Sequence, residues 1–183
     1  RAEEDLSGLA LLPLFLATRA GVRALVTADL AHELAVGKSL KQRGEALDWF
    51  RASLGFLKPP RPLLVCIGGL SGTGKSTLGA ALSPGIGGAP GALHVRSDVE
   101  RKVLAGVAET EHLPPARYSR EAAFEVYAAC LARAEKALEA GHSVVFDAVF
   151  AQSSERKSAE ALARRVNAQF RGFWLEAPSE LLK

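Results

Sequence analysis

The feature that most constrains this chain is a short apolar run that breaks into glycines and leads directly into a helical pattern. Residues Leu63 to Thr77 read Leu-Leu-Val-Cys-Ile-Gly-Gly-Leu-Ser-Gly-Thr-Gly-Lys-Ser-Thr. A match to the pattern G-x-x-x-x-G-K-[ST] begins at Gly69 and ends at Ser76, and this pattern requires a strand before it and a helix after it. Both are indicated here, so the stretch predicts a loop that binds phosphate groups rather than a glycine-rich turn ending in Lys-Ser by chance.

Each residue type in this loop has a chemical reason. A phosphate chain needs several converging N–H donors, and glycine lets the backbone curl tightly enough to present them. The amides that follow open a helix, where unpaired donors and the helix dipole favour an anion. We expect Lys75 to contact the β and γ phosphates of ATP, and Ser76 to bind Mg²⁺. The predicted nucleotide-binding residues are Gly69, Leu70, Ser71, Gly72, Thr73, Gly74, Lys75, Ser76 and Thr77.

The size and charge of the chain limit the function classes. Its 183 residues suffice for one domain, or for one domain and part of another. The formal charge of +3 comes from 23 basic and 20 acidic residues. This surplus is too small to indicate a nucleic-acid groove, and acidic phosphate ligands explain it equally well.

The cysteines and the N-terminal segment indicate in which cellular compartment the protein is found. Cys66 and Cys130 occupy positions typical of buried small apolar residues, which predicts reduced core cysteines in a cytoplasmic protein, with a disulfide as the less favoured reading. The apolar run from Gly8 to Ala17 contains Pro13 and is far shorter than the roughly 20 residues that span a bilayer, so we expect no membrane segment. The chain lacks methionine and stops just after a strand, so we expect it to be a fragment of a longer protein.

The periodicity of apolar residues changes at a proline-rich break. Helical spacing predicts two helices, over 5–32 and 38–57, and the prolines at 59, 60 and 62 then favour a domain boundary, giving domains over 1–58 and 59–183. After the break, strands alternate with helices, which implies parallel βαβ units and a three-layer α/β fold. The strands are predicted at 63–67, 92–96, 143–147 and 170–175, and the helices at 75–82, 99–104, 119–140 and 154–166.

Ligands of open parallel sheets bind beyond the carboxyl ends of the strands. At the second strand end, Asp98 precedes Arg101 by one helical turn. A phosphoryl-transfer enzyme needs a carboxylate to accept the proton of an attacking hydroxyl and a cation to hold an anionic substrate or the charge that develops. We therefore predict both as catalytic residues together with Lys75. The alternative is that Asp98 only caps a helix starting at Val99.

The third predicted strand ends in Asp147, which we expect near Mg²⁺. Motor-type ATPases commonly place a glutamate at the next position to activate water, but this chain has Ala148, so phosphoryl transfer to a hydroxyl fits better than hydrolysis. The guanine-reading Asn-Lys-x-Asp run is absent. His94, His112 and His142 show no metal-ligand spacing with the cysteines, and we interpret them as structural or surface residues.

Together these motifs resemble small P-loop kinases related to polynucleotide kinase, gluconate kinase and zeta toxin. The residues that carry the resemblance are Gly69 to Thr77, Ser97-Asp98-x-x-Arg101, the helix from Tyr118 to Gly141, Val144 to Ala148 and Gly172 to Glu176. The resemblance implies a sheet of order 2-3-1-4-5, with Asp98 activating the acceptor hydroxyl of a small molecule or nucleotide. Such kinases continue with an arginine-bearing lid and a fifth strand, which we expect to lie beyond Lys183.

The first 58 residues look like the C-terminal helices of an aminoglycoside-phosphotransferase-like domain, carried by Leu12-Pro13-Leu14-Phe15, Arg19-Ala20 and Val22-Arg23-Ala24. The resemblance implies an intramolecular kinase-like partner domain before Arg1. Two functions stay open. One is an ATP- and Mg²⁺-dependent kinase, and the other is an ATP-binding or ATPase module that regulates the adjoining domain.

Overall fold

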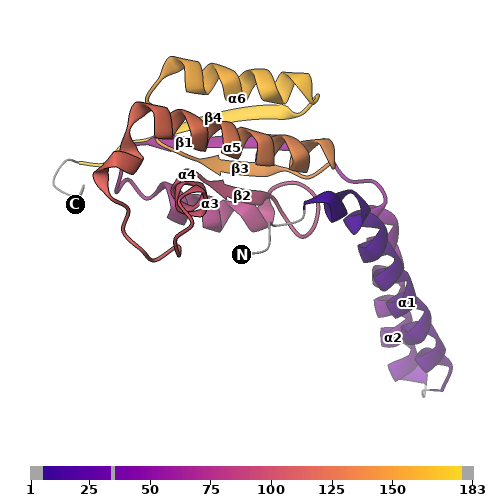
Figure 1. Ribbon diagram of the computed structural model, residues 1–183. Helices are drawn as coiled ribbons and strands as arrows, with labels where there is room; N and C mark the ends of the chain where they lie inside the picture. Colours follow the sequence, from indigo (N-terminus) through magenta and orange to yellow (C-terminus); the bar gives the residue numbers. More distant parts are fainter. Residues whose placement is uncertain (1–5, 34–35, 179–183) are drawn as a thin grey trace. The chain divides into compact units, whose positions relative to one another are not determined.

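The computed structural model describes residues 6–33 and 36–178 of the chain. It divides into two compact units, one over Gly8–Pro60 and the other containing the chain from Arg61 onward. Figure 1 shows the first as a pair of helices and the second as a sheet with helices on both faces. The prediction that residues 1–58 and 59–183 are two domains stays a prediction.

The first unit is a helical hairpin that packs through small side chains. It contains the 3₁₀ helix η1 (Ser7–Leu11), α1 (Leu12–Glu33) and α2 (Val36–Phe56). The hydroxyl of Ser53 in α2 donates a hydrogen bond to the carbonyl of Ala17 in α1 over 2.8 Å. The buried residues of α1 are Ala17, Ala20, Ala24, Thr27 and Ala31, which recur at helical spacing.

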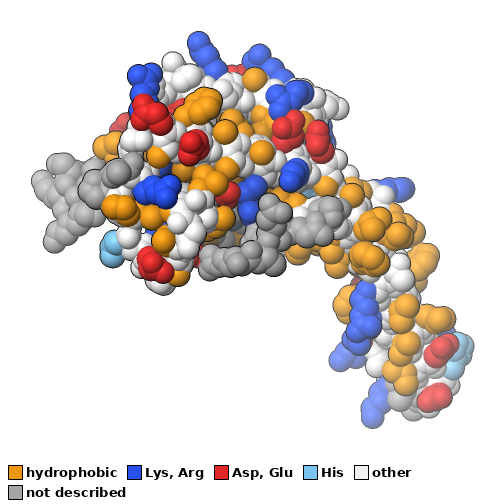
Figure 2. Space-filling model, in the orientation of Figure 1, with side chains coloured by type: hydrophobic (Ala, Val, Ile, Leu, Met, Phe, Trp, Pro, Cys, Tyr) orange, Lys and Arg blue, Asp and Glu red, His pale blue; other side chains and the backbone are white. Residues whose placement is uncertain are grey.

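The larger apolar side chains of the hairpin lie at its surface, as the orange atoms of this unit in Figure 2 show. On α2, the apolar face that the sequence indicates is largely exposed, including Leu40 at 66% and Phe50 at 52%. On α1 the same holds for Leu14, Phe15, Val22, Leu25, Val26 and Leu30. Helical periodicity predicted the two helices, but close approach of the two backbones buries the alanines and leaves the large side chains outside.

The stretch Gly8–Glu33 is long and apolar enough to cross a membrane by length and composition, because 18 consecutive residues within it have a mean hydropathy of 1.6. The apolar helix is therefore longer than the run from Gly8 to Ala17 that the sequence indicates, and the expectation of no membrane segment stays a prediction. Pro13 does not interrupt the helix because it lies in the first turn of α1, where proline is tolerated. Helices of this length and composition also occur in the cores of soluble proteins, and within the unit α1 buries one face against α2.

The second unit confirms the predicted α/β class. Its elements are β1 (Leu63–Gly69), α3 (Lys75–Leu82), η2 (Ser83–Gly85), β2 (Leu93–Arg96), α4 (Ser97–Leu104), η3 (Pro115–Tyr118), α5 (Arg120–Glu139), β3 (Val144–Asp147), α6 (Ser153–Arg165) and β4 (Gln169–Leu175). All described strand pairs are parallel, and the sheet order is β2-β3-β1-β4, as the resemblance implied. In Figure 1, α3 lies on one face of the sheet and α5 and α6 lie on the other.

The central strands are apolar on both faces because both are covered by helices. On the α3 face, Val65, Ile67 and Val145 form a buried cluster with Leu78 and Leu82 of α3. On the opposite face, Cys66 of β1 and Cys130 of α5 are free and buried, and burial raises the pKa of each thiol to about 12. The predicted burial of both cysteines in the core is therefore confirmed, and their reduced state stays a prediction.

An aromatic cluster fixes the turn that follows β3. The rings of Phe146 and Phe150 meet edge to face with centroids 4.9 Å apart, and Tyr127 packs against both. The Tyr127 hydroxyl accepts a hydrogen bond of 2.7 Å from the amide of Phe150. Phe150 has a φ of 51°, a left-handed conformation that a bulky residue adopts only when its surroundings impose it.

We predict that Phe146→Ala lowers the free energy of unfolding by about 3–5 kcal/mol, because it opens a cavity where the side chain is fully buried. Phe124→Ala is the matched control, since Phe124 is 77% exposed and its loss changes stability by less than about 0.5 kcal/mol. Urea denaturation followed by far-UV circular dichroism measures both. Equal midpoints for the two variants contradict the packing described here.

Candidate active site

The candidate site lies where β1, β3 and β2 end. Ile67 pairs with Asp147, and Asp147 pairs with Arg96, so the carboxyl ends of the three strands meet at one edge of the sheet. The amide of Gly69 donates to the carbonyl of Val149 over 3.2 Å. This bond ties the start of the glycine-rich loop to the turn that follows Asp147.

The loop backbone adopts conformations that demand glycine. Gly69 has a φ of 144° and Gly74 a φ of 84°, both in the region that L side chains rarely adopt. A Cβ atom on Gly69 would also lie 2.5 Å from the Leu175 carbonyl oxygen and 2.9 Å from Oγ1 of Thr73. The glycines of the motif are thus fixed by the turn itself and by the close approach of β4.

The amides at the end of this loop are available to a ligand. Thr73 Oγ1 and Lys75 Nζ both donate to the carbonyl of Leu70, over 2.8 and 2.6 Å. Helix α3 begins without a side-chain cap. Among the residues that the structure describes, the amides of Gly74, Lys75 and Ser76 donate to no backbone carbonyl. Unpaired donors at a helix start favour an anion, as expected from the sequence.

Lys75 and Asp147 influence one another electrostatically. Desolvation lowers the pKa of Lys75 from its usual value, and the negative charge of Asp147 partly opposes this shift. The residue Asp147 is only 4% exposed. A buried carboxylate needs hydrogen bonds or nearby cations, and here it has the direct contact of the His94 ring and the electrostatic attraction of the Lys75 ammonium.

The contact of His94 with Asp147 was not predicted from the sequence, which indicated only that His94 is a structural or surface residue. Nε2 of His94 lies 2.8 Å from Oδ2 of Asp147. The contact joins residues on neighbouring strands that are not directly opposite one another, because His94 pairs with Val145. A diagonal contact between side chains on neighbouring strands does not correspond to any sequence motif.

The two catalytic candidates on α4, Asp98 and Arg101, contact different partners. Asp98 lies 3.3 Å from the ammonium of Lys102 and its side chain is 52% exposed. Arg101 instead donates to the Arg117 carbonyl over 2.8 Å and lies over the Tyr118 ring, 4.9 Å from its centroid. Helix α4 already begins at Ser97, with Arg96 at the N-cap position, so the alternative that Asp98 caps this helix is wrong.

A second basic contact at this edge was also missed. Arg96 forms an ion pair of 2.6 Å with the carboxylate of Glu109, and Lys102 donates to the Glu109 carbonyl. The Nε atom of Arg96 is buried and has no hydrogen-bond partner among residues 6–33 and 36–178. The segment between α4 and η3 is therefore fastened to the strand end by side chains that carry positive charge.

The donor set at the strand edge fits a magnesium ion. Mg²⁺ prefers oxygen ligands, keeps several waters and needs few protein groups. Ser76, with its hydroxyl, is the second residue of α3, and Asp147, with its carboxylate, is the last residue of β3. Among residues 6–33 and 36–178, no group of three His, Cys, Asp or Glu side chains is able to hold a metal by itself.

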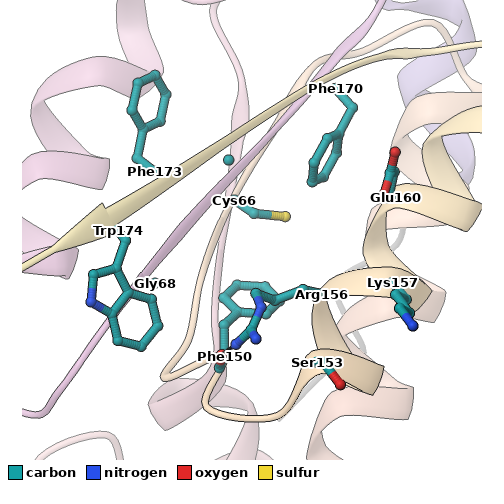
Figure 3. A pocket seen from close by; sticks show the side chains of 11 residues that line it. Cys66, Gly68, Phe150, Ser153, Arg156, Lys157, Glu160, Phe170, Phe173 and Trp174 are labelled. Atoms are coloured by element: carbon teal, nitrogen blue, oxygen red, sulfur yellow. Dashed lines mark hydrogen bonds between the residues drawn. The ribbon is translucent and has the colours of Figure 1, made fainter.

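A pocket with a volume of about 360 Å³ lies between α6 and the face of β1 and β4 (Figure 3). Its walls include Cys66, Phe150, Phe170 and Trp174, with Arg156 at its polar side. Lys75, Asp98 and Asp147 do not line it, so it is distinct from the phosphate-binding loop. Arg156 contributes to this wall while donating to the carbonyls of Phe150 and Ala151.

The phosphate-binding loop joins β1 to α3, and the parallel sheet has the order β2-β3-β1-β4. These features define a P-loop domain with a kinase-like fold. The chain belongs to the AAA domain family, which its residues 64–183 match. No curated protein matches the chain significantly.

Solved structures agree with this fold. A candidate kinase from Chloroflexus aurantiacus is 20% identical with a TM-score of 0.55, and the match covers 67% of this chain and 63% of that protein. The APS kinase CysC of Mycobacterium tuberculosis, in complex with AMPPNP and APS, is 22% identical with a TM-score of 0.51, covering 66% of each chain. This chain thus spans less than two thirds of the length of either protein.

We predict that Gly69→Ala destabilises the protein by about 1–3 kcal/mol, because a side chain at this φ is strained and its Cβ meets the Leu175 carbonyl. Gly172→Ala in β4 serves as the control, since the nearest atoms to its Cβ lie 3.7 Å away in ordinary contact. Urea unfolding midpoints compare the two variants. A Gly69→Ala protein as stable as Gly172→Ala contradicts the described loop conformation.

Proposed function

We propose that this chain is the nucleotide-binding part of an ATP-dependent kinase that transfers the γ-phosphate to a hydroxyl of a small molecule or nucleotide. The observation that carries the proposal is the set of amides at the start of α3 that donate to no backbone carbonyl of the described residues, together with the electrostatic coupling of Lys75 and Asp147. Anion donors, a cation and a carboxylate at one strand edge are the parts that phosphoryl transfer requires.

The residues of the chain have distinct roles in this reaction. Lys75 exchanges its hydrogen bond to the Leu70 carbonyl for the β and γ phosphates, and the amides from Gly72 to Thr77 hold the phosphate oxygens. Asp98 accepts the proton of the attacking hydroxyl, the acceptor oxygen bonds to the γ phosphorus, and the bond to the bridging oxygen of ADP breaks. Ser76 and Asp147 would hold Mg²⁺, which neutralises phosphate charge when bound.

Arg101 is proposed to hold an anionic acceptor group or the charge that develops in transfer. In the structure its guanidinium is engaged by the Arg117 carbonyl and the Tyr118 ring. Contact with a substrate therefore requires an exchange of these partners. Asp98 faces no comparable restriction, because half of its side chain is exposed and its ion pair with Lys102 is near the surface.

The comparisons support ATP at the level of the fold. The APS kinase of similar architecture was solved with AMPPNP, an ATP analogue, and with APS. The AAA domain family match spans the phosphate-binding loop, β2, β3 and β4. A cytoplasmic location stays a prediction that rests on the two buried free cysteines.

For the hairpin, we propose the tail of an aminoglycoside-phosphotransferase-like domain. Its exposed large apolar side chains support this assignment, because they are typical of a surface that the rest of a larger domain covers. The family match begins at residue 64, after this unit. The regulatory alternative, in which ATP binding controls the adjoining domain, rests on the same hairpin and is favoured by no separate observation.

We predict that Asp98→Ala reduces acceptor-dependent ADP release about 10²–10⁴-fold with little change in ATP affinity, because it removes the group that takes the hydroxyl proton. Asp48→Ala is the matched control, since Asp48 is a 76% exposed aspartate in α2. The assay screens hydroxyl-bearing acceptors against the full-length protein. ADP release that no acceptor stimulates and that survives Asp98→Ala rules out the kinase and favours the regulatory alternative.

A further inference from the structure

The hydrogen bond between His94 and Asp147 has a geometry that points to a role beyond filling the core. A carboxylate oxygen accepts hydrogen bonds, so Nε2 of His94 is the donor in the 2.8 Å contact to Oδ2. The side chains are 18% and 5% exposed, respectively, so water competes little for the bond. This bond uses Oδ2 of Asp147, and the second carboxylate oxygen, Oδ1, takes no part in it.

The strand register explains how the two side chains meet. In parallel strands, paired residues project to the same face, and successive residues alternate between faces. Since His94 pairs with Val145 and Arg96 pairs with Asp147, all four side chains project to the face covered by α3. His94 thus reaches Asp147 diagonally, beneath the helix that the phosphate-binding loop opens.

Helix α3 leaves room for the imidazole at Gly79. A Cβ atom at Gly79 would lie 2.8 Å from Cε1 of His94, and it would come closer still to Nε2. Gly79 is fully inside the helix, where glycine is intrinsically unfavourable by about 1 kcal/mol relative to alanine. The helix therefore accepts an unfavourable residue at the point where the ring passes toward Asp147.

We propose that His94 is a positioning residue that fixes the Asp147 carboxylate, so that one oxygen is held by the ring and the other is presented to the divalent cation. This inference rests on the proposed function, in which Asp147 contributes to the Mg²⁺ site. Partners that orient a metal-binding side chain commonly change metal affinity by about 10- to 100-fold when removed. The ring acts through Asp147 and touches neither nucleotide nor acceptor.

Two substitutions of similar polarity separate positioning from packing. The amide nitrogen of glutamine can occupy the place of Nε2, whereas that of asparagine corresponds to Nδ1 and falls short of Asp147. We expect His94→Asn to weaken Mn²⁺ binding to the ATP complex about tenfold and His94→Gln to retain most of the affinity. Electron paramagnetic resonance of free Mn²⁺ measures the Mn²⁺ affinity of each ATP complex. The affinity for a fluorescent ATP analogue in EDTA is expected to be unchanged in both variants.

The same measurements distinguish the failure of this inference from that of the proposed function. A wild-type protein that binds no ATP in EDTA overturns both. A wild-type protein that binds ATP and Mn²⁺, with His94→Asn and His94→Gln equal in Mn²⁺ affinity, overturns the positioning role alone. The urea midpoints of both variants are measured as well. If the ring only fills space, the two variants differ in stability but not in Mn²⁺ affinity. If His94→Asn does not fold, Gly79→Ala replaces it, since it displaces the ring while keeping the histidine.

Discussion

The parallel pairing of β3 with both β1 and β2 is the constraint on which the site depends. It sets Asp147 opposite Ile67 on one side and opposite Arg96 on the other. Because all three strands run in the same direction, the loop after β1, the acid that ends β3 and the start of α4 open at a single edge. A shift of one residue in this register would turn Asp147 to the opposite face, away from Lys75 and His94.

Much of this edge could be predicted because its residues belong to local patterns. The glycines of the loop are required by backbone conformation, and Lys75 and Ser76 follow them at fixed spacing. Asp147 ends an apolar run, which identifies a strand end without any knowledge of its neighbours. The parallel α/β class follows from alternation of strands and helices, and the structure confirms it.

The remaining features depend on contacts between distant parts of the chain, which one sequence does not encode as a motif. His94 meets Asp147 across 53 positions, and the space for its ring is set by Gly79 on a different element. The hairpin shows the same limit in another form. Spacing predicted its helices, but the sequence did not indicate that alanines would form the contact while leucines stay exposed, because this depends on how closely two helices approach.

Under the proposed function, the cations around the second strand end would affect how an acceptor is bound. Arg96 and Lys102 both contact Glu109, and Arg101 contacts the carbonyl of Arg117. The segment that follows α4 therefore already occupies the groups that suit an anionic substrate. Binding then exchanges one set of hydrogen bonds for another, and only the difference between them contributes to affinity. Since the Arg96–Glu109 pair is partly exposed, its loss costs little. The buried Nε of Arg96 has no partner in the part of the chain that the structure describes, so an acceptor that reached it would gain a bond that these residues do not supply.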